Sequence, residues 1–186
     1  MTTDVTNARR DEAVTSRVMF ISVRLFVAAD AFFFLGFFFA YLYLRALDSN
    51  LHWHPSGTDP SAALGTVLAV SVILAAGALR YGAERAARAG VIAALVLVLV
   101  AFACQGVQLF NPGFSPSYGG GYGAVFVGYS AAMFGHLLGA LYWVETLAVD
   151  REPSATVRAE QARIASVFVT FLAGVSLVAY ILIYLV

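Results

Sequence analysis

The chain has 186 residues, of which 61% are hydrophobic and 12% are charged, about half the charged fraction of an ordinary soluble domain. This composition favours a membrane as the surroundings of most of the chain. The formal net charge is zero, which gives no sign of a nucleic-acid partner, and the single cysteine, Cys104, can form no internal disulfide.

Five hydrophobic segments are each long enough to cross about 30 Å of hydrocarbon at 1.5 Å per helical residue. They cover residues 18–44, 62–79, 90–110, 122–147 and 164–186. The sequence therefore predicts an all-α, polytopic membrane protein with a tail, residues 1–17, followed by one domain of five transmembrane helices. The first segment is too long for the core of a cleavable secretion signal and lacks a small-residue cleavage site after it. Between the last two segments, residues 154–163 are expected to form a short helix capped by Ser154.

The arginines predict the orientation of these helices. Three arginines precede the first segment, three lie between the second and third, and three lie between the fourth and fifth. Arg45 lies on the other side, and Arg24, just inside the first segment, has a side chain long enough to reach the headgroups. Because Lys and Arg are enriched in cytoplasmic loops, the N-terminus is predicted to be cytoplasmic and the C-terminus to lie outside.

The first segment contains an acid, Asp30, near its middle. A carboxylate at that depth costs roughly 2.5–3.5 kcal/mol on insertion scales, so it must be protonated or have a partner. The face that carries Asp30 is aromatic, with Phe26, Phe34, Phe37 and Tyr41 at helical spacing. Two interpretations are open: a protonated acid that only bonds a neighbouring helix, or a proton-exchanging or regulatory carboxyl.

The third and fourth segments also carry polar side chains at membrane depth. Gln105 and Gln108 are three residues apart and share one helix face, a pattern that favours hydrogen bonds between helices. His136 lies in the fourth segment beside Gly135 and Gly139, two small residues that allow another backbone to come close. A single histidine in this setting is more often a hydrogen-bonding core residue than a ligand.

The residues predict no catalytic centre, metal ion or cofactor within this chain. Haem held by two histidines would need a second histidine inside the membrane, and a disulfide oxidoreductase would need a second cysteine. Ser130 lies about 240° around the helix from His136, which does not bring the two side chains together for nucleophilic catalysis.

Several of these segments share motifs with one known family. Residues 29–38 read Ala-Asp-Ala-Phe-Phe-Phe-Leu-Gly-Phe-Phe, residues 105–110 read Gln-Gly-Val-Gln-Leu-Phe, and residues 135–139 read Gly-His-Leu-Leu-Gly. The chain resembles subunit III of the haem–copper cytochrome oxidases, in its short bacterial form with five helices. The likeness aligns Asp30 with a buried, carbodiimide-reactive glutamate of the family.

The same likeness aligns His136 with the second of two histidines in the family's fourth-helix motif. Met133 stands at the first of these histidines, and Gln108 replaces an acid of the third helix. The Trp-His motif of the family's last helix is missing. The chain is therefore identified as a divergent member.

The resemblance implies a non-catalytic subunit in a bacterial cell membrane. It would pack on oxidase subunit I, which with subunit II holds the haems and copper, and support proton uptake and the durability of the active site during O2 reduction. It would also bind phospholipid, in a groove that we expect beside Asp30, lined by the aromatic side chains Phe26, Phe34, Phe37 and Tyr41. Three alternatives stay open: the accessory subunit of a nitric oxide reductase, a small stand-alone transporter that uses Asp30 and His136, and a membrane scaffold without a redox partner.

Overall fold

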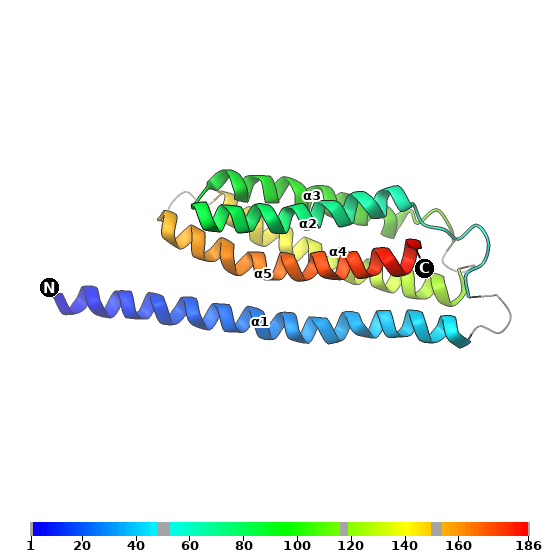
Figure 1. The fold of residues 1–186 in the computed structure, drawn as a ribbon, viewed down its shortest axis with the longest axis horizontal. Coiled ribbons are helices and arrows are strands. Elements are labelled where there is room, and N and C mark those ends of the chain that lie inside the picture. Colours follow the sequence, from blue (N-terminus) through cyan, green and yellow to red (C-terminus); the bar gives the residue numbers. More distant parts are fainter. Residues whose placement is uncertain (1, 48–52, 116–118, 150–153, 186) are drawn as a thin grey trace.

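The computed structural model describes residues 2–47, 53–115, 119–149 and 154–185. In these ranges the chain forms helices and no strands (Figure 1). The elements are α1 (Thr2–Leu47), α2 (Ala62–Arg85), α3 (Arg88–Phe110), α4 (Gly120–Val149), α5 (Ala155–Tyr180) and a π-helical turn, η1 (Ile181–Leu185). Five helices are long and apolar enough to cross a membrane. The predicted all-α class is thus confirmed, and so is the prediction of five helices long and apolar enough to span a membrane.

Two boundaries differ from the prediction at the arginine-rich end of the bundle. The predicted tail, 1–17, is helical from Thr2 and continuous with the first span, because residues 2–17 contain neither proline nor glycine. The short helix predicted over 154–163 is continuous with the fifth span in α5. Its expected cap is present, since the backbone N–H of Val157 donates to Ser154 Oγ at 3.3 Å.

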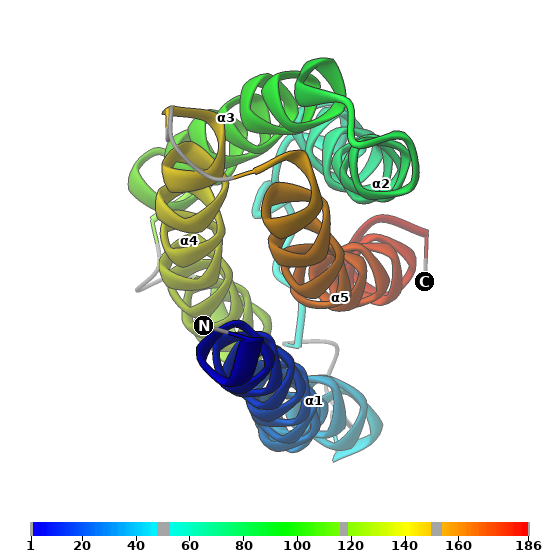
Figure 2. The same cartoon turned by 90° about the vertical axis from the view of Figure 1, so that its left-hand side faces the viewer.

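The helices form a bundle in which α5 is the central element. Figure 2 shows α2, α3 and α4 curving around α5, while α1 lies against α4 and α5. Only one stripe of α1 packs on the bundle: Phe34 and Tyr41 are buried, whereas Phe32 on the opposite side is 78% exposed. The aromatic outer surface of α1 therefore faces whatever surrounds this chain in the membrane.

Small residues bring α2 and α3 into close contact. A Cβ added to Gly90 of α3 would lie 2.7 Å from the Cα of Gly82 in α2, so only glycine fits there. The turn between these helices places Ala86 in the left-handed region, with φ of 49°. This tight hairpin holds one side of the buried core, which includes Val72, Leu79, Val98, Leu137 and Leu172.

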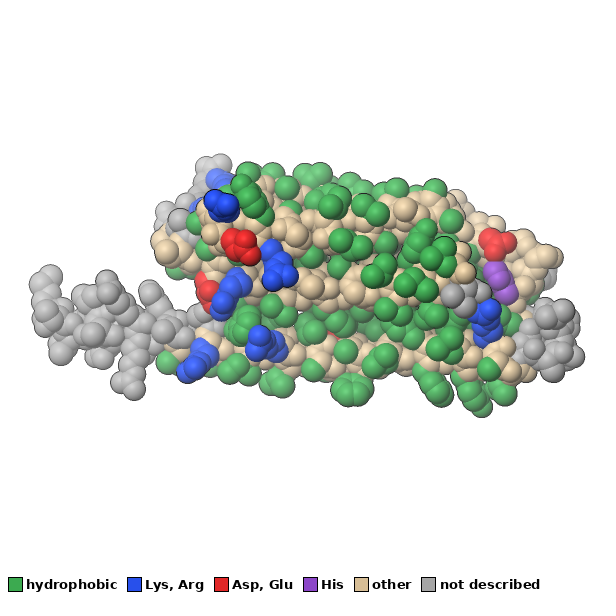
Figure 3. Space-filling view, in the orientation of Figure 1, with side chains coloured by type: hydrophobic (Ala, Val, Ile, Leu, Met, Phe, Trp, Pro, Cys, Tyr) green, Lys and Arg blue, Asp and Glu red, His purple; other side chains and the backbone are tan. Residues whose placement is uncertain are grey.

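Basic side chains gather at one end of the bundle. Consecutive helices run in opposite directions, so the beginnings of α1, α3 and α5 lie with the ends of α2 and α4. Figure 3 shows most of the basic side chains on this face at this end. The other end holds Arg45, in the last turn of α1, and His54, in the loop before α2. Arg88 is anchored here by donating from Nη2 to the carbonyl of Ala148 at 2.8 Å.

Candidate functional site

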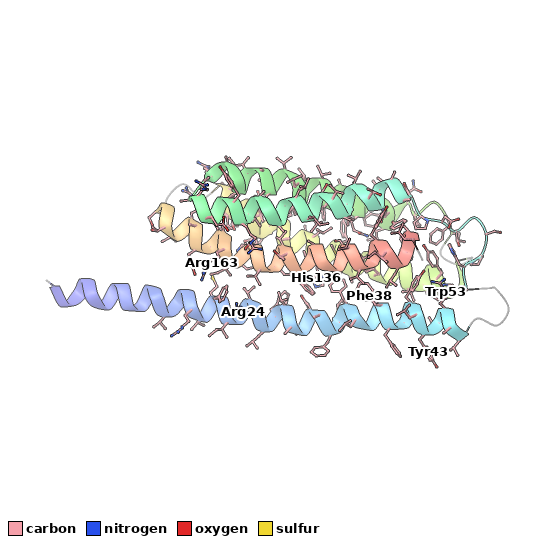
Figure 4. The ribbon with its side chains drawn as sticks, viewed as in Figure 1. Arg24, Phe38, Tyr43, Trp53, His136 and Arg163 are labelled. Carbon is pink, nitrogen blue, oxygen red and sulfur yellow. The ribbon has the colours of Figure 1, made fainter. Side chains whose placement is uncertain are left out.

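The two polar residues predicted separately on the first and fourth spans meet in the structure. Nε2 of His136 on α4 lies 3.2 Å from Oδ2 of Asp30 on α1, and the side chains are only 19% and 15% exposed. Figure 4 places His136 where α4 faces α1. The carboxyl group thus faces a neighbouring helix, because the stripe of α1 that carries it is the stripe that packs on the bundle. A lipid groove beside Asp30 stays a prediction.

The hydrogen bonds of His136 determine how many protons the pair holds. Nδ1 lies 2.7 Å from the carbonyl oxygen of Ala132, which can only accept, so Nδ1 must carry a hydrogen. In a neutral imidazole Nε2 is then a bare acceptor. It attracts Asp30 only if one further proton sits on either Oδ2 or Nε2. With that proton the pair has zero net charge, and without it an unpaired carboxylate faces a lone pair at membrane depth.

The contact between Nε2 and Oδ2 is short, but the two groups are not aligned for a hydrogen bond. The Nε2 to Oδ2 distance allows an ion pair, yet within the described chain Oδ2 has no partner with hydrogen-bond geometry. A small rotation of either side chain would be enough to make the bond, since the two atoms are already within reach. We therefore treat Asp30 and His136 as one candidate site.

Aromatic rings enclose this pair. The His136 ring lies 4.9 Å from the Phe34 ring, edge to face, and 6.1 Å from the Phe33 ring, nearly stacked. Phe168 of α5 adds a third ring, with its centroid 6.4 Å from that of His136. These apolar rings lower the local dielectric, which strengthens the electrostatic interaction between the two side chains.

The four aromatic residues expected to line a lipid groove do not share one environment. Phe34 and Tyr41 are buried between helices, Phe37 is half-buried, and Phe26 is exposed while contacting the ring of Phe168. Lipid contact stays a prediction for these side chains, and burial makes Phe34 and Tyr41 the least accessible. Other rings of α1 are at least as exposed as Phe26, namely Phe32, Phe39 and Tyr43.

Gln105 and Gln108 lie inside the bundle and bond across elements, as their spacing predicts. Nε2 of Gln105 donates to the carbonyl of Ser130 in α4 at 3.3 Å. Gln108 donates to the carbonyl of Ser61 at the start of α2 at 3.5 Å and is hydrogen-bonded to Tyr184 of η1. These amides satisfy polar groups at the meeting point of four helices, and they do not extend to the Asp30–His136 pair.

Sequence reasoning missed an aromatic cluster at the end of the bundle opposite the arginines. The loop before α2 inserts Trp53 against Tyr41 and Tyr122, with ring centroids 5.2 and 6.0 Å away. His54 stacks on Tyr122 at 4.0 Å and lies 3.3 Å from Asp59. The backbone N–H of Tyr122 also donates to the carbonyl of Trp53. The run Trp-His-Pro at 53–55 was the available signal, because such residues rarely sit in a loop without packing.

A second feature that the sequence did not reveal is a pocket of about 570 Å³ at the arginine-rich end. We call it the arginine–glutamate pocket. It lies between α1, α2 and α5, and its charged lining residues are Arg80, Glu84, Glu160 and Arg163, with Phe20 as an aromatic wall. In the sequence these charges look like ordinary loop and helix-end residues, so no pattern indicated that three helices bring them together.

Of the glycines in α4, Gly128 contacts another helix, whereas Gly135 and Gly139 do not. Gly128 receives the ring of Phe37, whose Cε1 would lie 2.9 Å from an added Cβ. No atom of the described chain comes within 4 Å of the Cβ positions of Gly135 and Gly139, and both residues are exposed. The close backbone approach expected at these two glycines is therefore not made by another helix of this chain.

Within the described residues, no three His, Cys, Asp or Glu side chains come together as a metal ion would require. Compared with models of known protein families and with curated protein sequences, the chain matches none.

Proposed function

We propose that this chain is a non-catalytic subunit of the subunit III type in a haem–copper terminal oxidase of a bacterial cell membrane. It would pack on oxidase subunit I, bind phospholipid, and support proton uptake and the durability of the active site during O2 reduction. The haems and copper would belong to subunits I and II. Its N-terminus would be cytoplasmic and its C-terminus outside.

The Asp30–His136 contact carries this proposal. The resemblance selected these two positions independently, from motifs on the first and fourth spans. Their side chains lie 3.2 Å apart in an apolar site. Ionisable residues inside a membrane often mark proton or ion paths, so a paired acid and histidine supports a role linked to proton movement.

The open glycine face of α4 supports the idea of a larger neighbour. Small residues let helices approach closely in a membrane, where van der Waals packing drives association. Gly135 and Gly139 offer such a surface, and it is left uncovered by this chain. A transmembrane helix of subunit I would fit there.

The test is to extract the tagged chain gently from its native membrane and record the optical spectrum of what accompanies it. We expect haem absorption from a companion protein in the native sample. Replacing both Gly135 and Gly139 by Leu should remove most of that haem while the chain itself stays folded, because no described residue comes within 4 Å of either Cβ position. A matched control is Gly174→Leu, at an equally open position on α5.

Three outcomes would contradict the proposal or one of its parts. A purified chain with no haem protein beside it, but with substrate flux of its own in liposomes, would favour the transporter. An unchanged haem content in the Gly135→Leu, Gly139→Leu variant would reject the glycine face as the contact. Identifying the companion as a nitric oxide reductase would assign the chain to that complex instead.

A further inference from the structure

A small polar cavity lies in the core of the bundle where α2, α3, α4, α5 and η1 meet. Its volume is about 10 Å³, close to the roughly 10–15 Å³ that one water molecule needs. The polar side chains that line it are uncharged and belong to Gln105, Gln108, Tyr129, Ser176, Tyr180 and Tyr184. Such a lining suits a small neutral molecule, because a buried ion would need an opposite charge beside it.

Two of these side chains have polar atoms that the described chain leaves without a hydrogen-bond partner. Gln105 is 1% exposed, and its hydrogen bond to the carbonyl of Ser130 uses the amide nitrogen, which leaves Oε1 as a free acceptor. Tyr129 is 6% exposed, and its hydroxyl group makes no hydrogen bond to another described residue. Since buried polar groups are nearly always hydrogen-bonded, both atoms require a partner, and both residues line the cavity.

The π-helical turn η1 closes one side of the cavity with Tyr184. A Cβ added to Gly65 of α2 would lie 2.5 Å from the ring of Tyr184, so the ring fills the space that glycine leaves. Tyr184 is hydrogen-bonded to Gln108 and lies near enough to Tyr129 for their hydroxyl groups to interact electrostatically. The cavity therefore lies between polar groups of α3, α4 and η1 that one small molecule can connect.

We infer that this cavity binds one ordered water molecule. The water accepts a hydrogen bond from the hydroxyl group of Tyr129 and donates one to Oε1 of Gln105. Its second hydrogen is donated to the oxygen of Tyr184 or to that of Ser176, whose own hydrogen is bonded to the carbonyl of Leu172. The inference goes beyond the proposed function and does not depend on it, because it rests only on how these helices pack.

A crystal structure of the full-length chain in a lipid phase, at a resolution that shows ordered waters, tests the inference. We expect one peak of density within about 2.7–3.2 Å of both Gln105 Oε1 and the hydroxyl oxygen of Tyr129. An empty cavity would overturn the inference. So would a direct hydrogen bond from Tyr129 to Gln105 or Tyr184 that closes the space.

The salt in the crystals distinguishes a water from a monovalent cation. Crystals grown with rubidium in place of sodium should show the same weak peak, because water does not exchange with the salt. A peak that becomes much stronger in rubidium would identify a bound cation and overturn the assignment to water.

Variants identify the side chains that hold the water. Tyr129→Phe removes the donor and Gln105→Met removes the acceptor, so the density should be lost from each. Tyr142→Phe is the matched control and should retain the density, since Tyr142 is on the same helix as Tyr129 but is 69% exposed and does not line the cavity. Unchanged density in both Tyr129→Phe and Gln105→Met would contradict the assigned hydrogen bonds.

Thermal unfolding in detergent provides a second measurement of the same site. Tyr129→Phe should unfold at a midpoint roughly 2–4 °C below that of Tyr142→Phe, the shift expected when about one buried hydrogen bond is lost. Equal midpoints for these two variants would mean that Tyr129 holds no water.

Discussion

Asp30 and His136 illustrate how two polar residues that are each unfavourable in an apolar environment can stabilise one another. Either side chain alone would present an unpaired polar group to an apolar environment enclosed by Phe33, Phe34 and Phe168. Together they need only one shared proton, because Nδ1 of His136 is already committed to the carbonyl of Ala132. When it holds that proton, the pair has no net charge.

A double-mutant cycle should reveal this coupling. Asp30→Leu and His136→Leu are each expected to lower the unfolding free energy in detergent, but by less in combination than the sum of the two, with a coupling of about 0.6–2 kcal/mol. Asp30→Asn should retain most of the coupling, because its amide N–H can donate to Nε2 without a proton from solvent. Strictly additive losses would mean that the contact contributes nothing to stability.

The α2–α3 hairpin shows at the scale of elements how small residues determine packing. Gly82 and Gly90 let the two backbones touch, whereas Gly77 on the outer side of α2 has no atom of the described chain within 4 Å of its Cβ position. Glycine normally weakens a helix by about 0.5–1 kcal/mol relative to alanine. At position 90 the close contact with Gly82 explains why the residue is glycine. At position 77 no contact within the described chain explains it.

Gly90→Ala and Gly77→Ala should consequently have effects of opposite sign. A methyl group at position 90 would lie 2.7 Å from the Cα of Gly82, and such overpacking costs about 1–3 kcal/mol. The same change at position 77 meets open space and should stabilise the helix slightly. Unfolding of both variants in detergent, followed by circular dichroism, measures the difference. A Gly90→Ala variant as stable as the parent would show that the hairpin can separate without cost.

For the whole molecule, the distribution of arginine makes the two ends of the bundle chemically different. One end holds the arginine–glutamate pocket and the contact of Arg88 with α4. The opposite end holds the aromatic cluster of Trp53, Tyr41 and Tyr122. Because basic residues are retained on the cytoplasmic side, the arginine end should face the cytoplasm.

Cysteine labelling in cells tests that orientation. In a Cys104→Ser background, a membrane-impermeant maleimide should label Asp59→Cys in intact cells, because Asp59 is exposed beside the aromatic cluster. Arg85→Cys, exposed at the arginine end, should react only after the membrane is permeabilised. The reverse pattern would place the N-terminus outside.

The spans could be predicted from the sequence because a hydrophobic run of sufficient length leaves few choices for backbone groups in lipid. The face of Asp30 could also be predicted, since helical periodicity fixes which residues share a side. The helix that packs against this face could not be predicted, because periodicity gives no information about neighbouring helices. His136 was therefore recognised only as a separate polar residue. Arg80 and Glu160 were likewise unrecognisable as pocket residues, since their proximity depends on how α2 and α5 pack.

The helix α1 is continuous over its whole length. At 1.5 Å per residue its 46 residues extend for about 70 Å, well beyond the thickness of a bilayer. From Phe26 to Tyr41 the helix is held to the bundle by aromatic contacts and by the carboxyl–imidazole contact. The turns before Arg17 lie outside the candidate span. Because the helix is continuous, a change of tilt in the part that packs on the bundle would also move those first turns.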